Sequence, residues 1–213
     1  MAQLVSFAGL LNTGNLGPLR PGMTMNEVAV LLGPPESWLV TPGTGPAPTF
    51  WGYGRLEIEF IFESETPYCR YFMLTSDPYM RGDCQCITND FLIYLDGLNG
   101  DSRISDFIRL INDIDSVAVI LSDLAGYSNP MMWIGNSIEV IFSSKIDEKM
   151  DVEFKDVDRG DVIRALDGDC VLSSIFTFYY ANDDSRLHNI ERREERRDSS
   201  VSGREYLAAL EGA

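Results

Sequence analysis

Few side chains in this sequence have the type and spacing that catalysis needs. The single histidine, His188, lies in a charged segment, whereas Ser-His-Asp and Cys-His sites need a histidine beside a nucleophile in a pocket. No G-x-S-x-G, phosphate-binding loop or dinucleotide-binding glycine pattern occurs. With 33 Asp and Glu residues, some carboxylate pair would always look suitable for glycoside hydrolysis, so such a pair is uninformative. The sequence predicts a protein that is not an enzyme.

The cysteines and the acidic segments give no strong metal signal. Cys84-x-Cys86 is narrower than the usual zinc spacing and lacks a histidine partner. Cys69 and Cys170 complete a set without a disulfide framework, so free thiols in a reducing compartment are expected. The Asp- and Glu-rich residues 147–169 lack the ligand spacing of a calcium loop and are predicted to form a solvated acidic loop. We therefore expect no metal and no cofactor.

The strongest compositional signal is the net charge of −16, from 33 acidic and 17 basic residues. Residues 182–213 carry six Arg and eight Asp or Glu, so a net charge of −14 belongs to residues 1–181. Such a body repels nucleic acids and anionic membranes and attracts basic proteins. No apolar stretch is long enough to span a membrane, and Met1–Leu11 lacks a basic leader region. We expect a cytoplasmic protein.

The clearest local signal is the capping box formed by Thr24 and Glu27, which predicts a helix over residues 25–32. Gly33 and the two prolines after it should end this helix. Ile104, Phe107, Ile108 and Ile111 mark one face of a second helix. Residues 1–11 are expected to form a short helix, and residues 77–89 an irregular segment.

Alternating or β-branched apolar residues predict the strands. These strands cover residues 49–53, 55–62, 68–75, 91–95, 117–121, 131–134, 137–143 and 171–180.

Two of the predicted hairpins resemble each other. Residues 50–62 and 132–142 both read as an aromatic strand, a Gly-containing turn and an alternating strand with Glu on its polar side. A helix precedes each hairpin and an apolar strand follows it. We infer an α+β chain with a tandem pair of helix-plus-antiparallel-sheet units, residues 1–98 and 99–181, and a charged, partly ordered or helical tail over residues 182–213.

The polar sides of the two hairpins form the candidate binding surface. Acidic and apolar residues should project together from the sheet, flanked by aromatic rings, a mixture that suits protein binding. An ordinary solvent-facing sheet explains the pattern equally well. The candidate partner-binding residues are Trp51, Tyr53, Glu57, Glu59, Ile61, Trp133, Glu139 and Ile141.

The segment from Leu19 to Pro35 resembles the small α/β module of the SmpA/OmlA outer-membrane assembly lipoproteins. It is also similar to the module that is duplicated in β-lactamase inhibitory proteins. The segment from Trp51 to Phe60 and the turn at Leu95-Asp96-Gly97 resemble uncharacterised bacterial proteins of the immunity type. The chain lacks a lipobox cysteine, so membrane anchoring is not expected. The motif of residues 19–35 caps a helix and shapes a turn, so the resemblance implies a fold rather than a function.

These observations favour an inhibitor, of the bacterial immunity-protein type, that blocks a basic toxin or nuclease domain through an acidic surface. An alternative is a structural or assembly module that docks through Tyr206, Leu207 and Leu210 of the tail. An enzyme of unrecognised type remains a third reading, which a deep pocket lined by perturbed carboxylates would favour.

Overall fold

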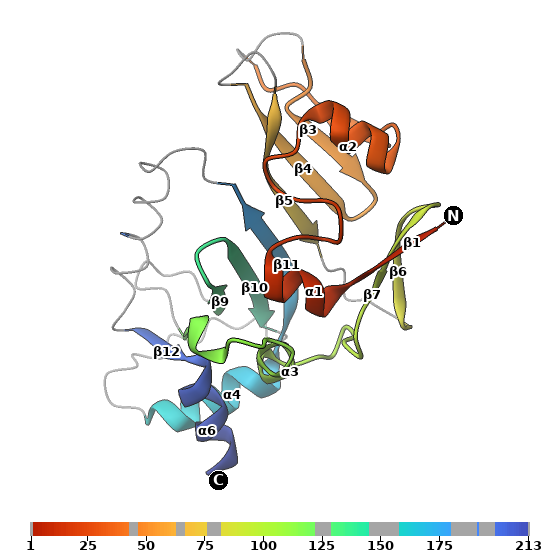
Figure 1. The fold of residues 1–213 in the computed structure, drawn as a ribbon. Coiled ribbons are helices and arrows are strands. Elements are labelled where there is room, and N and C mark those ends of the chain that lie inside the picture. The colour runs from red at the N-terminus through yellow and green to blue at the C-terminus, as the bar shows by residue number, and fades with distance from the viewer. Residues whose placement is uncertain are drawn as a thin grey trace.

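The structure of the chain, a computed structural model, describes residues 2–42, 47–62, 67–75, 82–121, 129–144, 158–179, 191 and 199–212. Its strands form a nine-stranded antiparallel sheet and a separate three-stranded sheet (Figure 1). The large sheet has the order β12-β8-β9-β10-β11-β5-β4-β3-β2, and the small one β1-β7-β6. This mixed architecture confirms the predicted α+β class.

The helices and strands can be given in their order along the chain. The first half contains β1 (Gln3–Ser6), α1 (Phe7–Thr13), α2 (Met25–Leu32), β2 (Ser37–Leu39), β3 (Phe50–Tyr53), β4 (Leu56–Ile61), β5 (Tyr68–Thr75), β6 (Cys84–Thr88) and β7 (Phe91–Tyr94). The second half contains α3 (Ile104–Arg109), the 3₁₀ turn η1 (Ile114–Ser116), β8 (Val117–Ile120), β9 (Met131–Ile134), β10 (Ile138–Ser144), α4 (Arg159–Asp169), β11 (Cys170–Phe178), β12 (Ser200–Ser202) and α6 (Gly203–Glu211).

The helices α1, α2, α3 and α6 pack on one face of the large sheet, which is the core face. Phe107 of α3 meets Phe142 of β10 edge to face, with ring centroids 5.4 Å apart. The buried hydroxyl of Tyr53 donates to the carbonyl of Gly33 at the end of α2, over 2.9 Å. Gly203 starts α6 so close to Val117 that an added Cβ would lie 2.9 Å from the Val117 Cβ. The core therefore lies between one sheet face and a layer of helices.

The order of the central strands is symmetric about the pair formed by β5 and β11. Moving outward from this pair, β4, β3 and β2 lie on one side, and β10, β9 and β8 on the other. Thus the hairpins β3–β4 and β9–β10, which resemble each other in sequence, occupy corresponding places in one continuous sheet (Figure 1).

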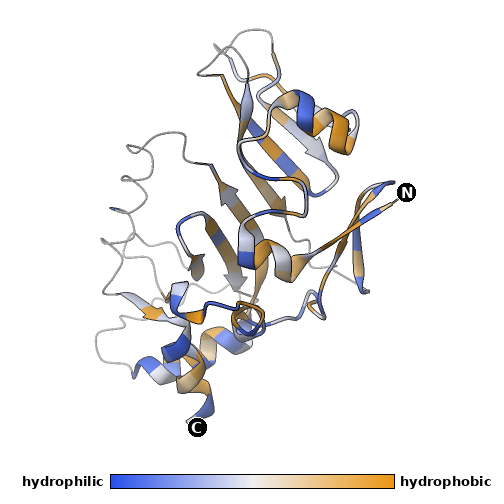
Figure 2. Cartoon of the chain, viewed as in Figure 1, coloured by the Kyte–Doolittle hydropathy of each residue, from blue (hydrophilic) through white to orange (hydrophobic). Residues whose placement is uncertain are grey.

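Most of the predicted elements are confirmed to within two residues. Helix α2 has the Thr24–Glu27 capping box, with Thr24 Oγ1 accepting from the Glu27 amide and the Glu27 carboxylate accepting from the Thr24 amide. Gly33 follows it with a φ of 80°. The alternation along β4 that predicted a half-buried strand is visible as banding in Figure 2.

Three local predictions are wrong. In place of the helix predicted over residues 1–11, residues 3–6 are a strand and residues 7–13 a helix, because β1 pairs in parallel with the distant β7. Residues 84–88, predicted to be irregular, form β6. Within the predicted acidic loop, residues 159–169 form α4, capped by Asp158 and buried through Val162 and Ile163. The remainder of that loop lies outside the described residues.

The last described residues, 199–212, are integrated into the fold. Strand β12 pairs with β8 at the edge of the large sheet, and Val201 is buried. Tyr206 is fully buried, and Leu207 and Leu210 of the same helix pack against the core. This part of the predicted tail is therefore a component of the core layer. Most of residues 182–198 lie outside the described residues.

Candidate functional site

The face of the large sheet opposite the helices carries acidic and aromatic side chains in neighbouring rows. Strand pairing places Glu57, Met73, Phe176 and Glu139 side by side across β4, β5, β11 and β10. A second row places Glu59, Tyr71 and Phe178 side by side. We call the set Glu57, Glu59, Tyr71, Glu139, Phe176 and Phe178 the acidic–aromatic face.

Three aromatic rings form the centre of the acidic–aromatic face. Tyr71 lies 5.9 Å from Phe176 and 5.7 Å from Phe178, measured between ring centroids. The rings of Phe176 and Phe178 are nearly parallel, at 8°. All three side chains are half-buried. Offset and edge-to-face aromatic pairs stabilise one another, so this cluster is a rigid apolar centre that keeps partial exposure.

The glutamates lie on both sides of the aromatic centre. Glu57 and Glu139 are three strand positions apart, which corresponds to about 14 Å at the usual strand spacing. Glu57 is exposed, whereas the carboxylate of Glu139 accepts a 3.1 Å hydrogen bond from the Trp133 indole. That bond fixes the direction of the Glu139 side chain.

Glu59 is largely enclosed, with a side chain 19% exposed. Burial raises its pKa, and Arg70, whose guanidinium lies 3.6 Å away, acts in the opposite direction. Burial also raises the pKa of the neighbouring Tyr71, and the charge of Glu59 adds to that effect. Tyr71 therefore stays a neutral hydrogen-bond donor beside an acidic group.

The structure brings together five of the eight residues proposed from the sequence. Glu57, Glu59, Ile61, Glu139 and Ile141 alternate with buried residues of β4 and β10 and lie on the face opposite the helices. The two glutamates of β4 share this face with the glutamate of β10 because β5 and β11 join the two hairpins into one sheet.

The three aromatic residues proposed from the sequence are not on this exposed surface. Tyr53 is fully buried, and Trp51 packs edge to face on Phe60, 4.8 Å away, so both lie on the core face. Trp133 lies on the same face as Glu139 but is 2% exposed. In the pairing of β3 with β4, Tyr53 lies opposite Leu56 and Trp51 opposite Ile58, and both partners are buried. Trp133 therefore supports Glu139 rather than contacting a partner.

Sequence reasoning missed the aromatic centre of the face. Tyr71, Phe176 and Phe178 lie in strands that are apolar on both sides, so their residue pattern does not distinguish the accessible side from the core side. Continuous apolar runs are typical of central strands, and β5 and β11 are indeed central. Leu39, 60% exposed on the edge strand β2, extends the second row beyond Phe50.

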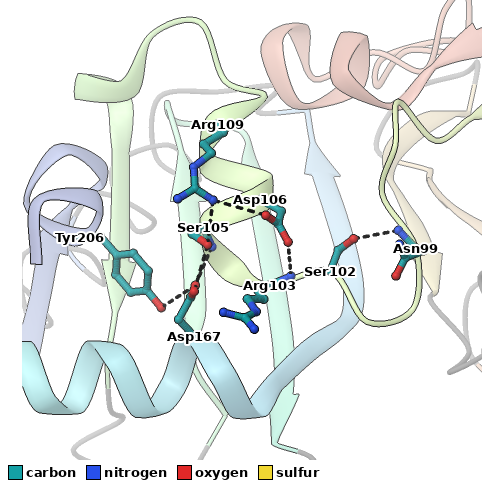
Figure 3. A network of polar contacts seen from close by, with 8 residues as sticks. All are labelled: Asn99, Ser102, Arg103, Ser105, Asp106, Arg109, Asp167 and Tyr206. Carbon is teal, nitrogen blue, oxygen red and sulfur yellow. Dashed lines mark hydrogen bonds and ion pairs between the residues drawn. The ribbon is translucent and has the colours of Figure 1, made fainter. Parts of the chain in front are cut away.

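A second polar region lies between α3, α4 and α6 (Figure 3). Asp167, 4% exposed, accepts hydrogen bonds from the amide of Ser105 at 2.8 Å and from its hydroxyl at 2.9 Å. The hydroxyl of Tyr206 lies 3.4 Å from the same carboxylate, and Arg109 donates to Ser105 at 3.3 Å. These hydrogen bonds join α3, α4 and α6 to one another, which indicates a structural role for the network.

A shallow cleft of about 390 Å³ opens beside this network. Its walls include Asp96, whose carboxylate accepts from the Ser6 hydroxyl and the Ala8 amide at 2.7 Å each. Asp106, also in the wall, accepts from the Arg103 amide and pairs with Arg109. Both carboxylates therefore hold helix starts in place, and the cleft has no arrangement that indicates acid–base chemistry.

Among the described residues, no three His, Cys, Asp or Glu side chains converge as a metal site would require. Within the same ranges, no helix combines the length and the apolar character needed to cross a bilayer.

Comparison with known proteins gives no match for this chain among protein-family models, curated proteins or solved structures.

Proposed function

We propose that this chain is a non-catalytic, protein-binding inhibitor that covers a basic partner, such as a toxin or nuclease domain, with its acidic–aromatic face. The observation that carries the proposal is the convergence of Glu57, Glu59 and Glu139 around a half-exposed aromatic centre. Protein interfaces commonly combine a few aromatic anchors with a polar rim. The acidic rim would select a basic partner.

The charge of the whole molecule supports the same partner class. A net charge of −16 would accelerate encounter with a basic protein, and would disfavour nucleic acids and anionic membranes. The symmetric strand order about β5 and β11 supports the reading of the chain as two similar units.

The alternative, an assembly module that docks through the tail, receives less support. Tyr206 is fully buried, and Leu207 and Leu210 already pack against the core. Tyr206 would have to leave the core before it could bind a partner, whereas Leu207 and Leu210 could contact one only through the part of each side chain that stays exposed. Deletion of residues 183–213 would also remove core residues, so surface substitutions are the better test.

The proposal is tested with two charge-reversed variants of equal net charge. The face variant carries Glu57→Lys, Glu59→Lys and Glu139→Lys; the control variant carries Asp83→Lys, Asp113→Lys and Glu211→Lys, away from the face. Tagged wild type and both variants are used to capture partners from native-host lysate at low salt. The captured protein is then identified and assayed with and without each variant.

We expect the wild type and the control variant to capture and inhibit the same basic protein. The face variant should associate on the order of tenfold or more slowly at low salt, because favourable charges have become repulsive. Equal capture by all three proteins would mean that the face is not the binding surface. Capture without any loss of the partner's activity would contradict an inhibitory role.

A further inference from the structure

Cys84 and Cys86 share one exposed face of the small sheet. Pairing places Cys84 beside Tyr94 and Cys86 beside Leu92, so all four side chains point to the same side. Both cysteines are exposed, whereas Ile87 and Ile93 of the same strands are buried. Strand β6 is an edge strand of this sheet (Figure 1). The two thiols are therefore adjacent and accessible.

The spacing of the pair decides which chemistry the thiols can share. Residues i and i+2 of a strand lie about 6.6 Å apart, and their Cα–Cβ bonds are nearly parallel. A disulfide needs Cβ atoms about 3.8 Å apart, so it would require β6 to distort. Two bonds of about 2.3 Å, the length of a zinc–thiolate bond, span about 4.6 Å. Since the two Cβ atoms are about 6.6 Å apart, rotation of both side chains toward each other can bring the sulfur atoms to that separation.

The surroundings of the pair favour a soft cation over a hard one. Leu4, 60% exposed, is paired with Leu92, and Ser6 with Tyr94, so this face presents apolar groups and hydroxyls around the thiols. These paired positions add no carboxylate or carbonyl side chain. The Thr88 backbone carbonyl accepts from Cys86, and the Asp96 carboxylate is engaged by Ser6 and Ala8, so the described contacts do not gather the six or more oxygen ligands of a calcium or magnesium site. Thiolates select soft ions such as Cu(I).

We propose that Cys84 and Cys86 form a two-thiolate site for a soft monovalent cation, with Cu(I) as its probe. On binding, each thiol releases its proton to solvent and its sulfur donates an electron pair to the ion, so no oxidant or reductant is consumed. The Cys86 thiol, which now donates to the Thr88 carbonyl at 3.1 Å, gives up that weak bond. This site is separate from the acidic–aromatic face and does not depend on the proposed function.

The test is an anaerobic titration of the full chain with the Cu(I)–bicinchoninate complex, whose colour fades as the protein removes copper. The variants are Cys84→Ser, Cys86→Ser and the double variant, which keeps the buried Cys69 and Cys170 as an internal control. Thermal unfolding of each variant checks that the exposed substitutions leave the fold intact, and gel filtration reports the size of the copper-loaded protein. Zn²⁺, which prefers four ligands, is the comparison ion.

We expect the wild type to take up one Cu(I) per monomer and every variant to lose that equivalent while unfolding like the wild type. A competitor concentration that leaves Cu(I) bound to the protein should remove Zn²⁺ from it. Uptake that persists in the double variant, or no uptake by the wild type, would overturn the proposal. Half an equivalent accompanied by dimerisation would place the two sulfur ligands on different chains and would overturn it as well.

Discussion

At the scale of single residues, Asp167 shows how one carboxylate can organise three helices. It lies in α4 and accepts two hydrogen bonds from Ser105 of α3, with the Tyr206 hydroxyl of α6 at 3.4 Å. Burial raises the pKa of Tyr206, so its hydroxyl remains a donor. A buried polar group without a hydrogen bond destabilises the fold. This network gives partners to the Asp167 carboxylate, the Ser105 hydroxyl and the Tyr206 hydroxyl.

The substitution Asp167→Asn is therefore expected to destabilise the fold by about 1–3 kcal/mol, because one side-chain oxygen becomes a donor facing other donors. Urea unfolding monitored by circular dichroism measures the change. Asp113→Asn, which removes the same charge at an exposed position, is the matched control and should change the free energy of unfolding by less than about 0.5 kcal/mol. Equal effects of both substitutions would show that the network contributes nothing specific.

The four thiols should fall into two classes of reactivity. Cys84 and Cys86 are exposed, whereas Cys69 and Cys170 are buried, and burial raises the pKa of Cys69 to about 12. The thiolate is the reactive form, so a disulfide reagent such as DTNB should modify two thiols rapidly in the native protein and two more only after denaturation. Rapid reaction of all four under native conditions would contradict the burial of Cys69 and Cys170.

At the scale of elements, the Thr24–Glu27 capping box of α2 and the Ser202–Glu205 capping box of α6 give the fold a dependence on acid pH. Hydrogen bonds from the Thr24 amide and hydroxyl lower the pKa of Glu27, and those from Ser202 lower the pKa of Glu205 in the same way. A carboxylate whose folded pKa lies below its unfolded value stabilises the fold above the unfolded pKa. That contribution disappears as the pH falls through the folded pKa.

We therefore expect the urea midpoint to fall as the pH drops below about 4.5, the ordinary value for Glu. The double variant Glu27→Gln/Glu205→Gln keeps an acceptor at each cap but no titrating group, so its midpoint should fall less steeply over this range. Glu211→Gln controls for the removal of charge alone. A double variant with the wild-type acid profile would rule out the two boxes as the origin of the dependence.

Elements with local signals were predictable from the sequence, and elements defined by distant partners were not. Helix α2 follows from Thr24 and Glu27, three residues apart, and β4 from its own alternation. Strands β1 and β2 have four and three residues and exist through pairing with β7 and β3. No pattern in so short a segment separates a strand from a loop.

Part of the candidate site was predictable from the sequence, and part was not. Alternation in β4 and β10 placed the glutamates on the polar side of each hairpin. It could not show that β5 and β11 bring the two hairpins into one sheet, or which face of the central strands stays accessible. Tyr53 and Trp133 were misplaced because an aromatic residue near a turn suits a core position as well as a surface one.

At the scale of the whole molecule, the C-terminal segment closes the core. Removing residues 199–213 would expose Val117 and the neighbouring apolar residues that β12 and α6 cover, and would leave the edge of β8 unpaired. We expect this truncation to lower the midpoint of thermal unfolding by several degrees or to prevent folding. The point variant Tyr206→Ala should move the midpoint in the same direction by a smaller amount.

Differential scanning fluorimetry measures both changes, with Glu211→Ala, at an exposed position of α6, as the control. If the truncated chain unfolds at the temperature of the full chain, the segment is an independent appendage. That result would make the tail available for docking and would favour the assembly-module alternative.

The junction between β5 and β11 has a consequence during synthesis of the chain. Thr75 ends β5 and Cys170 begins β11, 95 positions later. At translation rates of about 5–20 residues per second, about 5–20 s pass between the synthesis of β5 and the synthesis of β11. Throughout that interval the nascent chain presents an apolar edge with unpaired amides and carbonyls, which is a template for aggregation. The emerging first half is therefore the stage at which ribosome-associated chaperones would matter most for the yield of this protein.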